Sequence, residues 1–383
     1  MSICIFHASN LSICKSTRCI DLNNFLNVKK LKYSRGITIN EQKQLTNFLK
    51  LDDLSIYDDN IPEHIYIEHL HNLTSFCLEI TTKHVSKRKD LSLLLKHSKL
   101  RKLTLRYPNN LKSFPFVDCD KLTYLRLQNN GWGNADNMIP RNSLTNLENL
   151  ELYSIEFNAF HEIHSLIKLT SLNLTFQSDK VRIIYLSNLV SLLMDSFESN
   201  INVIVQNLPK LTKLWVFHCE DNDLNLLNLP KLKDLYLNGI KNINISNVKN
   251  LETVEIEHDG ISKDNLFTFC EMNCIKSLKM DDFEYGSDAD KRILQLKQEK
   301  MVIYGEYNLN EFYELQRLKR LTHLVLINNN NIKNALHLDH LLKLTIGYEE
   351  YLSNSRKVIV EKNVQIHSMT IQAALLKYGR YIL

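Results

Sequence analysis

A recurring apolar pattern constrains this chain more than any other feature. The five residues NLPKL occur at positions 207–211 and again at 228–232, an interval of 21 residues. A chain that restarts the same pattern at a nearly fixed interval is typical of a repeat architecture, in which each repeat forms one structural unit that stacks on the next. The repeat therefore has to be understood before any single motif.

The repeated pattern has the form apolar-x-x-apolar-x-apolar. It can be placed sixteen times, at intervals of 19 to 27 residues with an average of about 22.5. Of its 48 defined positions, 47 hold an apolar or aromatic residue, and Gln298 is the exception; a chain with 44% apolar residues would fill about 21 by chance. The units begin at Val28, Leu51, Leu73, Leu100, Leu122, Leu147, Leu169, Leu189, Leu211, Leu232, Leu251, Ile275, Gln298, Leu321, Leu341 and Ile366.

The spacing inside each unit predicts a short strand. Alternate residues of a strand point to opposite sides, so the apolar positions face inward and the residues between them face outward. One unit cannot bury its own leucines, so neighbouring units have to share a continuous core. We expect a solenoid with a parallel sheet, with helices in the return segments 90–100 and 265–273 and a protruding loop over 129–143.

Three units carry a longer motif that resembles the leucine-rich repeat superfamily. They are LTYLRLQNN (122–130), LTKLWVFHC (211–219) and LTHLVLINN (321–329). The resemblance implies an α/β solenoid with a curved parallel β-sheet on its concave face and short helices, 3-10 turns and loops on its convex face. A further leucine three residues before the unit start resembles the short class of internalin-like proteins, and it occurs at Leu70, Leu144, Leu166, Leu186, Leu208, Leu229, Leu318 and Leu338.

The sequence departs from this family at one position of the repeat. The slot that the family fills with Asn or Cys holds such a residue only at Asn130, Cys219 and Asn329, so we expect irregular curvature. The domain organisation that follows is an N-terminal cap over 1–25, a repeat array of about 16 units over 26–371, and a C-terminal cap over 372–383.

Charge and cysteine content limit the class of protein. The formal net charge is only +4, but residues 1–126 carry 20 Lys and Arg against 12 Asp and Glu, whereas residues 195–290 carry 9 against 17. The eight cysteines show no disulfide spacing, which favours reduced thiols and an intracellular, cytoplasmic location. No secretory signal and no membrane span are expected.

Motifs for catalysis or cofactors are not evident. The sequence has no phosphate-binding glycine motif, and HEIH at 161–164 has the wrong spacing for a zinc helix. Cys270 and Cys274 could share a helix face near His258, but buried thiols explain them better than a zinc site. We therefore predict no enzyme activity, no catalytic or metal-binding residues and no cofactor.

Binding of another protein is the function that the outward residues favour. In successive units the residue between the second and third apolar positions reads Leu193, Trp215 and Tyr236, and Phe217 lies two residues after Trp215. Adjacent aromatic rings on an open sheet face are typical of an interface, although a neighbouring loop could also cover them. Acidic residues beside them suggest a partner with a basic surface. The predicted partner-binding residues are Leu193, Asp195, Trp215, Phe217, Asp234, Tyr236, Glu255, Glu257 and Asp281.

Two alternatives stay open at this point. The chain could be the substrate-recruiting subunit of a ubiquitin ligase or phosphatase assembly, although no adaptor motif is evident. It could also bind nucleic acid or an anionic membrane surface through an N-terminal basic stripe, although charged faces are more often simply solvated. The stripe consists of Lys30, Lys32, Lys102, Arg106, Tyr124 and Arg126.

Overall fold

The protein is represented by a computed structural model. It describes residues 9–14, 21–34, 37–57, 69–79, 99–107, 120–129, 144–155, 163, 165–176, 180–196, 201–217, 222–257, 269, 272, 274–280, 300–304, 323–327, 343–352 and 355–365. The chain forms two compact units, Met1–Phe197 (unit 1) and Glu198–Leu383 (unit 2).

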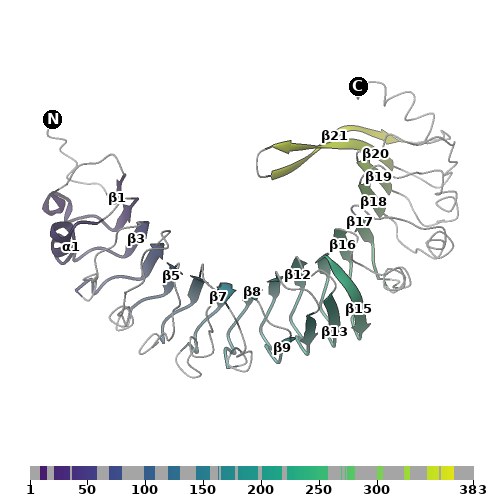
Figure 1. Ribbon diagram of the computed structural model, residues 1–383, viewed down its shortest axis with the longest axis horizontal. Helices are drawn as coiled ribbons and strands as arrows, with labels where there is room; N and C mark the ends of the chain where they lie inside the picture. The colour runs from purple at the N-terminus through teal and green to yellow at the C-terminus, as the bar shows by residue number, and fades with distance from the viewer. Residues whose placement is uncertain are drawn as a thin grey trace. The chain divides into compact units, whose positions relative to one another are not determined.

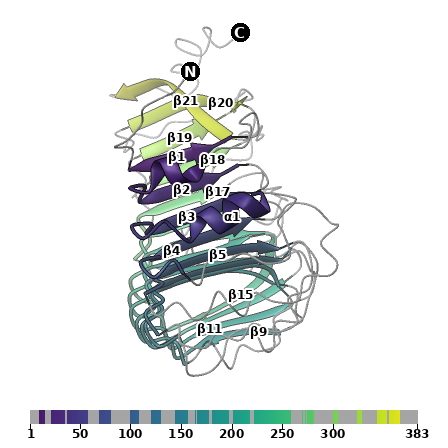
Figure 2. The ribbon, with the colours of Figure 1, turned by 90° about the vertical axis from the view of Figure 1, so that its left-hand side faces the viewer.

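Unit 1 is built from short strands that recur along the chain (Figures 1 and 2). Strands β1 to β8 pair in chain order and in parallel, and β8 then pairs with β10. The elements are β1 (Asn10–Ile13), the 3-10 helix η1 (Leu22–Phe25), β2 (Lys30–Tyr33), α1 (Ile39–Leu45), β3 (Asp53–Tyr57), β4 (Ser75–Glu79), β5 (Lys102–Tyr107), β6 (Tyr124–Asn129), β7 (Asn149–Ile155), β8 (Ser171–Phe176), β9 (Lys180–Ile184) and β10 (Ser191–Ser196).

Unit 2 continues the same pattern. Strands β12, β14 and β16 to β20 pair in parallel, and β21 pairs antiparallel with β20. The elements are β11 (Asn202–Gln206), β12 (Lys213–Phe217), β13 (Asn222–Leu227), β14 (Asp234–Asn238), β15 (Ile240–Ser246), β16 (Thr253–Glu257), β17 (Ser277–Met280), β18 (Lys300–Tyr304), β19 (His323–Ile327), β20 (Lys343–Leu352) and β21 (Ser355–Gln365).

The strand registers confirm the predicted inward positions. In the parallel strand pairs of the described residues, the second apolar residue of a repeat pairs with its counterpart in the next strand, as Leu103 does with Leu125 in unit 1 and Leu214 with Leu235 in unit 2. These side chains are at most 2% exposed. Burying one leucine stabilises a fold by roughly 1.5–3 kcal/mol, so the shared core between coils dominates stability. The predicted solenoid with a period of about 22 residues is confirmed, since paired positions such as Thr74 and Asp52 lie 22 residues apart.

The return segments differ in part from the prediction. Among the described residues helix is confined to α1, η1 and isolated residues such as Phe269, so the α/β label is only loosely confirmed. In unit 2 strands β11, β13 and β15 form a second parallel sheet, which closes the other side of these coils (Figure 1). Its inward residues, such as Val203 and Leu224, are buried. The alternation of apolar and polar residues over 202–206 was a strand signal that our sequence analysis missed.

Asparagine ladders fix the turns of this second sheet. Asn207, Asn228 and Asn247 each follow one of its strands with φ between 56° and 57°, and Tyr185 in unit 1 has φ 60° at the equivalent repeat position. Asn tolerates the left-handed conformation better than most residues. The three amides also bond in series, because Asn247 donates to Asn228 and Asn228 donates to Asn207, each at 3.0 Å. The asparagine that opens NLPKL is therefore a turn residue.

A second ladder runs along the edge where the strands of the main parallel sheet begin. The residue before each repeat is often Asn or Lys, and its side chain bonds to the preceding coil. Asn72 donates to the Leu49 carbonyl oxygen at 2.6 Å, and Lys99 donates to the Asn72 side-chain oxygen at 2.8 Å. These bonds satisfy exposed carbonyls at the turns and hold neighbouring coils in register.

The two ends of the repeat contain features that the sequence did not predict. Strand β1 lies inside the predicted N-terminal cap and pairs with β2 in the same parallel register as the later strands. Strands β20 and β21 form an antiparallel hairpin, with a register shift between Ile346 and Gly347. Several predicted features lie outside the described residues: the loop at 129–143 except Asn129, most of both predicted helices, the slots at Asn130, Cys219 and Asn329, and the C-terminal cap.

We expect Asn228→Ala to destabilise unit 2 by about 1–3 kcal/mol, because it loses two ladder hydrogen bonds and places alanine in a left-handed conformation. Asn228→Gly is the matched control: it loses the same bonds but tolerates φ 56°. Thermal unfolding followed by circular dichroism should rank the midpoints as wild type, then Asn228→Gly, then Asn228→Ala. Equal midpoints for all three proteins would contradict a structural role for the ladder.

Candidate functional site

The predicted aromatic residues of unit 2 lie on the outward face of the sheet. Trp215 and Phe217 come from β12 and Tyr236 from β14, and all three are half-buried. Their inward neighbours on the same strands, Leu214 and Leu235, are 0% and 2% exposed. The outward orientation therefore agrees with the alternation that the sequence predicted.

The aromatic side chains lie next to one another. Trp215 pairs with Tyr236 in the register of β12 and β14, and the rings of Phe217 and Tyr236 have centroids 4.7 Å apart at an interplanar angle of 38°. The ammonium group of Lys213 lies 5.9 Å from the centroid of the Trp215 ring. This distance is near the outer limit of a cation–π interaction, so the indole ring already has a cation beside it. We call Trp215, Phe217 and Tyr236, together with the carboxylates of Asp234 and Glu255, the aromatic–acidic surface.

Two of the predicted acidic residues flank these rings. Asp234 pairs with Lys213 across β12 and β14, and Glu255 pairs with Tyr236 across β14 and β16. Both are half-buried. The side chain of Glu257 and the whole of Asp281 lie outside the described part of the chain. Leu193 and Asp195 face outward on β10, which belongs to unit 1, and are also half-buried.

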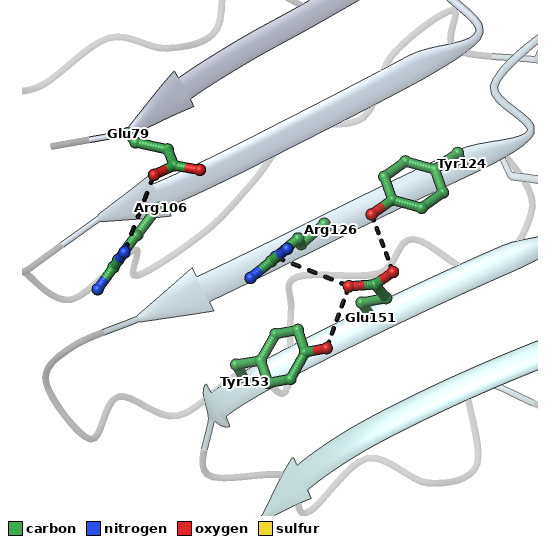
Figure 3. A network of polar contacts seen from close by, with 6 residues as sticks. All are labelled: Glu79, Arg106, Tyr124, Arg126, Glu151 and Tyr153. Atoms are coloured by element: carbon green, nitrogen blue, oxygen red, sulfur yellow. Dashed lines mark hydrogen bonds and ion pairs between the residues drawn. The ribbon is translucent and has the colours of Figure 1, made fainter. Parts of the chain in front are cut away.

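Unit 1 carries a different surface, centred on Glu151 of β7 (Figure 3). The hydroxyl of Tyr124 donates to one carboxylate oxygen of Glu151 at 2.9 Å, and the hydroxyl of Tyr153 donates to the other at 3.1 Å. The Nε atom of Arg126 lies 3.7 Å from Glu151, and its guanidinium carbon lies 5.0 Å from the centroid of the Tyr153 ring. We call these four residues, with Arg106 and Glu79, the arginine–tyrosine cluster.

The predicted basic stripe is thus more mixed in charge than the sequence analysis assumed. Lys30, Lys32 and Lys102 are exposed, but Arg106 faces Glu79 with 3.8 Å between Nη1 and Oε2, and Arg126 faces Glu151. The stripe as predicted omitted Glu79 and Tyr153. Each lies two residues after an outward residue of its own strand, Cys77 for Glu79 and Glu151 for Tyr153, and therefore points to the same face of the sheet. This spacing could have identified both residues from the sequence.

Tyr57, Tyr124 and Tyr153 of unit 1 are held in their protonated form. Burial, the hydrogen bond to Glu151 and the charge of Glu151 raise the pKa of Tyr124 to about 12. Burial, followed by the charge of Glu151, raises the pKa of Tyr153 as well. Burial and the neighbouring Cys77 raise the pKa of Tyr57 to about 12, and Lys32 lies 4.6 Å above the Tyr57 ring. These hydroxyls act as hydrogen-bond donors at neutral pH.

The half-buried thiol of Cys77 is a poor nucleophile. Burial raises the pKa of Cys77 to about 11, so the thiol is protonated at neutral pH. Its sulfur lies 3.8 Å from the Tyr57 hydroxyl. Within the described ranges, no group of three or more His, Cys, Asp and Glu side chains could hold a metal ion. The described helices are also all too short or too polar to cross a membrane.

We expect the stability of unit 1 to fall as pH rises from about 10 towards 12. In this window the unfolded chain loses the Tyr124 proton while the folded chain keeps it, and the state that binds fewer protons is favoured as pH rises. Tyr124→Phe removes this difference, so its thermal midpoint should fall less steeply over the same window. Midpoints measured by circular dichroism from pH 8 to 12 test this, and identical pH slopes for the two proteins would show that Tyr124 does not contribute.

Comparison with solved structures finds similar chains at low sequence identity and with TM-scores below 0.5. No family model and no curated protein matches the chain. Among solved structures it is similar to an internalin from Listeria monocytogenes, with a TM-score of 0.45 and 17% identity over 74% of this chain and 90% of that chain. It is also similar to a leucine-rich repeat protein of Leptospira interrogans, with a TM-score of 0.45 and 18% identity over 85% and 91%.

A third similar structure is the TLR13–ssRNA13 complex, with a TM-score of 0.42 and 18% identity over 83% of this chain and 42% of that chain. The strand registers and the buried leucines define the architecture of the chain. The chain has the architecture of a leucine-rich repeat solenoid with short repeats.

Proposed function

We propose that the chain is a non-enzymatic scaffold that binds another protein through the aromatic–acidic surface of unit 2. The observation that supports this most is the pairing of Trp215 with Tyr236 on neighbouring strands, with both rings outward and partly exposed. Aromatic side chains lose little conformational freedom on binding and dominate the energetics of many interfaces.

The sheet beneath these rings favours tight binding. Leu214, Val216 and Leu235 anchor the same strands in the core and are at most 2% exposed. A rigid backbone presents the rings in one arrangement, so a partner meets a preorganised surface. The ring contact between Phe217 and Tyr236 restricts both side chains further.

The carboxylates indicate a partner with a basic surface. Asp234 and Glu255 lie beside the rings, and Lys213 shows that the face of Trp215 is within reach of a cation. A lysine or arginine of the partner could contact a ring and a carboxylate together. Charges of this kind mainly accelerate encounter and select partners, while the rings supply affinity.

Other observations support a protein scaffold over an enzyme or a nucleic-acid binder. The protonated thiol of Cys77 is a poor nucleophile near neutral pH. The cysteine spacing of the sequence favours a reducing, cytoplasmic compartment. In unit 1 the carboxylates of Glu79 and Glu151 lie within the basic stripe, and a phosphate backbone along the stripe would meet both.

The double variant Trp215→Ala/Tyr236→Ala tests this function. We expect it to weaken binding of the partner by roughly 1,000-fold, because interface residues of this type each contribute about 2 kcal/mol, or about 30-fold. Partners recovered by affinity capture and mass spectrometry should first be purified, and their affinity for wild type and variant then measured by calorimetry. Circular dichroism confirms that the variant is folded.

The matched control is Tyr185→Asn, which removes a 65% exposed aromatic ring of unit 1 at a position with φ 60°. Asn occupies the equivalent position of three later repeats, so the exchange should not disturb the backbone. The control should bind like wild type. A folded double variant with wild-type affinity would exclude the aromatic–acidic surface as the binding site.

Asp234→Asn/Glu255→Gln should slow association most at low salt.

A further inference from the structure

Arg106 and Arg126 form a pair on the sheet face of unit 1. Arg126 of β6 is opposite Thr104 of β5, and Arg106 follows Thr104 by two residues on the same face. The two arginines are therefore diagonal neighbours on adjacent strands, at a separation that long side chains can bridge. Each side chain is 38% exposed.

Neither guanidinium donates a hydrogen bond to any described residue. Their contacts with Glu79 and Glu151 are 3.8 Å and 3.7 Å long, beyond the range of a hydrogen bond. The Nε of Arg106 is enclosed and has no hydrogen-bond partner within the described residues. An arginine has five N–H donors in a planar fork, so the outer nitrogens of both residues are available to a bound group.

The carboxylate of Glu151 does not need Arg126 as a hydrogen-bond donor. Its two oxygens accept hydrogen bonds from the hydroxyl groups of Tyr124 and Tyr153, as Figure 3 shows. The ring of Tyr153 meanwhile supports the guanidinium of Arg126, with 5.0 Å between the ring centroid and the guanidinium carbon. Arg126 is thus held in place while its donors remain uncommitted, which is the arrangement of a preorganised anion receptor.

The outer layer of the arginine–tyrosine cluster is cationic. Glu79 and Glu151 are 24% and 20% exposed, less than the arginines that face them. The carboxylates therefore lie deeper than the guanidinium groups. Lys32 and Lys102 are exposed on the same face and add to the positive potential.

We propose that Arg106 and Arg126 bind a carboxylate of an acidic protein segment. Two arginines and two glutamates are formally neutral together, so a single negative charge fits this cluster better than a phosphate dianion. The planar guanidinium fork matches a carboxylate in a bidentate contact. Nucleic acid fits less well, because Lys32 and Arg126 cover ring faces of Tyr57 and Tyr153 that would otherwise stack on bases.

The experiment measures binding of a fluorescein-labelled peptide of alternating Glu and Gly to the full chain by fluorescence anisotropy at 50 mM salt. The same peptide with Gln in place of Glu is the comparison. We expect the Glu peptide to bind at least tenfold more tightly than the Gln peptide. Arg126→Gln should weaken binding of the Glu peptide about tenfold, since it removes charge-assisted hydrogen bonds. Arg106→Gln should also weaken it.

Lys121→Gln is the charge-matched control, because it removes one exposed cation of unit 1 at the strand edge, outside the arginine–tyrosine cluster. It should retain affinity within about twofold, because an exposed charge outside the cluster is screened by salt. Equal binding of the Glu and Gln peptides to wild type would overturn the proposal without recourse to any variant. So would wild-type affinity of a folded Arg126→Gln, or displacement of the peptide by an equimolar concentration of inorganic phosphate, which would indicate a phosphate site.

This site is independent of the proposed function. All its residues lie in unit 1, whereas the test of the proposed function changes Trp215 and Tyr236 in unit 2. A negative result in the peptide experiment would not contradict the proposed role of the aromatic–acidic surface. A negative result in the partner experiment would not contradict the proposed role of the arginine pair.

Discussion

Burial of leucines between successive coils is the interaction on which this structure depends. Each inward side chain stacks on its counterpart in the neighbouring strand, as Leu125 does on Leu150. No coil could exclude water from these side chains alone, so the free energy gained is a property of neighbours in contact. The one-to-one register that results also aligns every outward residue with its counterpart. Columns of surface residues are therefore a direct consequence of core packing.

Ladders of polar side chains fix the geometry of the turns, which burial of apolar side chains alone does not. Burial alone would tolerate turns of several shapes, but Asn228 combines a left-handed backbone with hydrogen bonds to the coils on both sides. At another turn, where the strands of the main parallel sheet begin, Asn and Lys side chains also donate hydrogen bonds to the preceding coil. Such bonds contribute about 1 kcal/mol each, less than a buried leucine, and they act mainly by fixing turn geometry.

The inward positions could be predicted because strand alternation and burial are both periodic and local. The outward column containing Trp215 and Tyr236 followed from the same alternation. The arginine–tyrosine cluster could not be predicted as a unit, because it depends on which rotamers bring Tyr124, Arg126 and Tyr153 to Glu151. The second sheet was missed because strands such as Asn202–Gln206 lie outside the recurring leucine pattern by which the strands were located.

The dependence of surface on core also limits how the two surfaces can change. A slip of one residue in β6 would turn Arg126 inward and expose Leu125 and Leu127, so the register of the leucines protects the position of the arginine. Replacing an outward residue has no such cost, because its side chain does not contribute to the shared core. The same scaffold can thus present exposed guanidinium groups in unit 1 and aromatic rings with carboxylates in unit 2. Recognition chemistry in this protein is set by residues that the fold itself does not require.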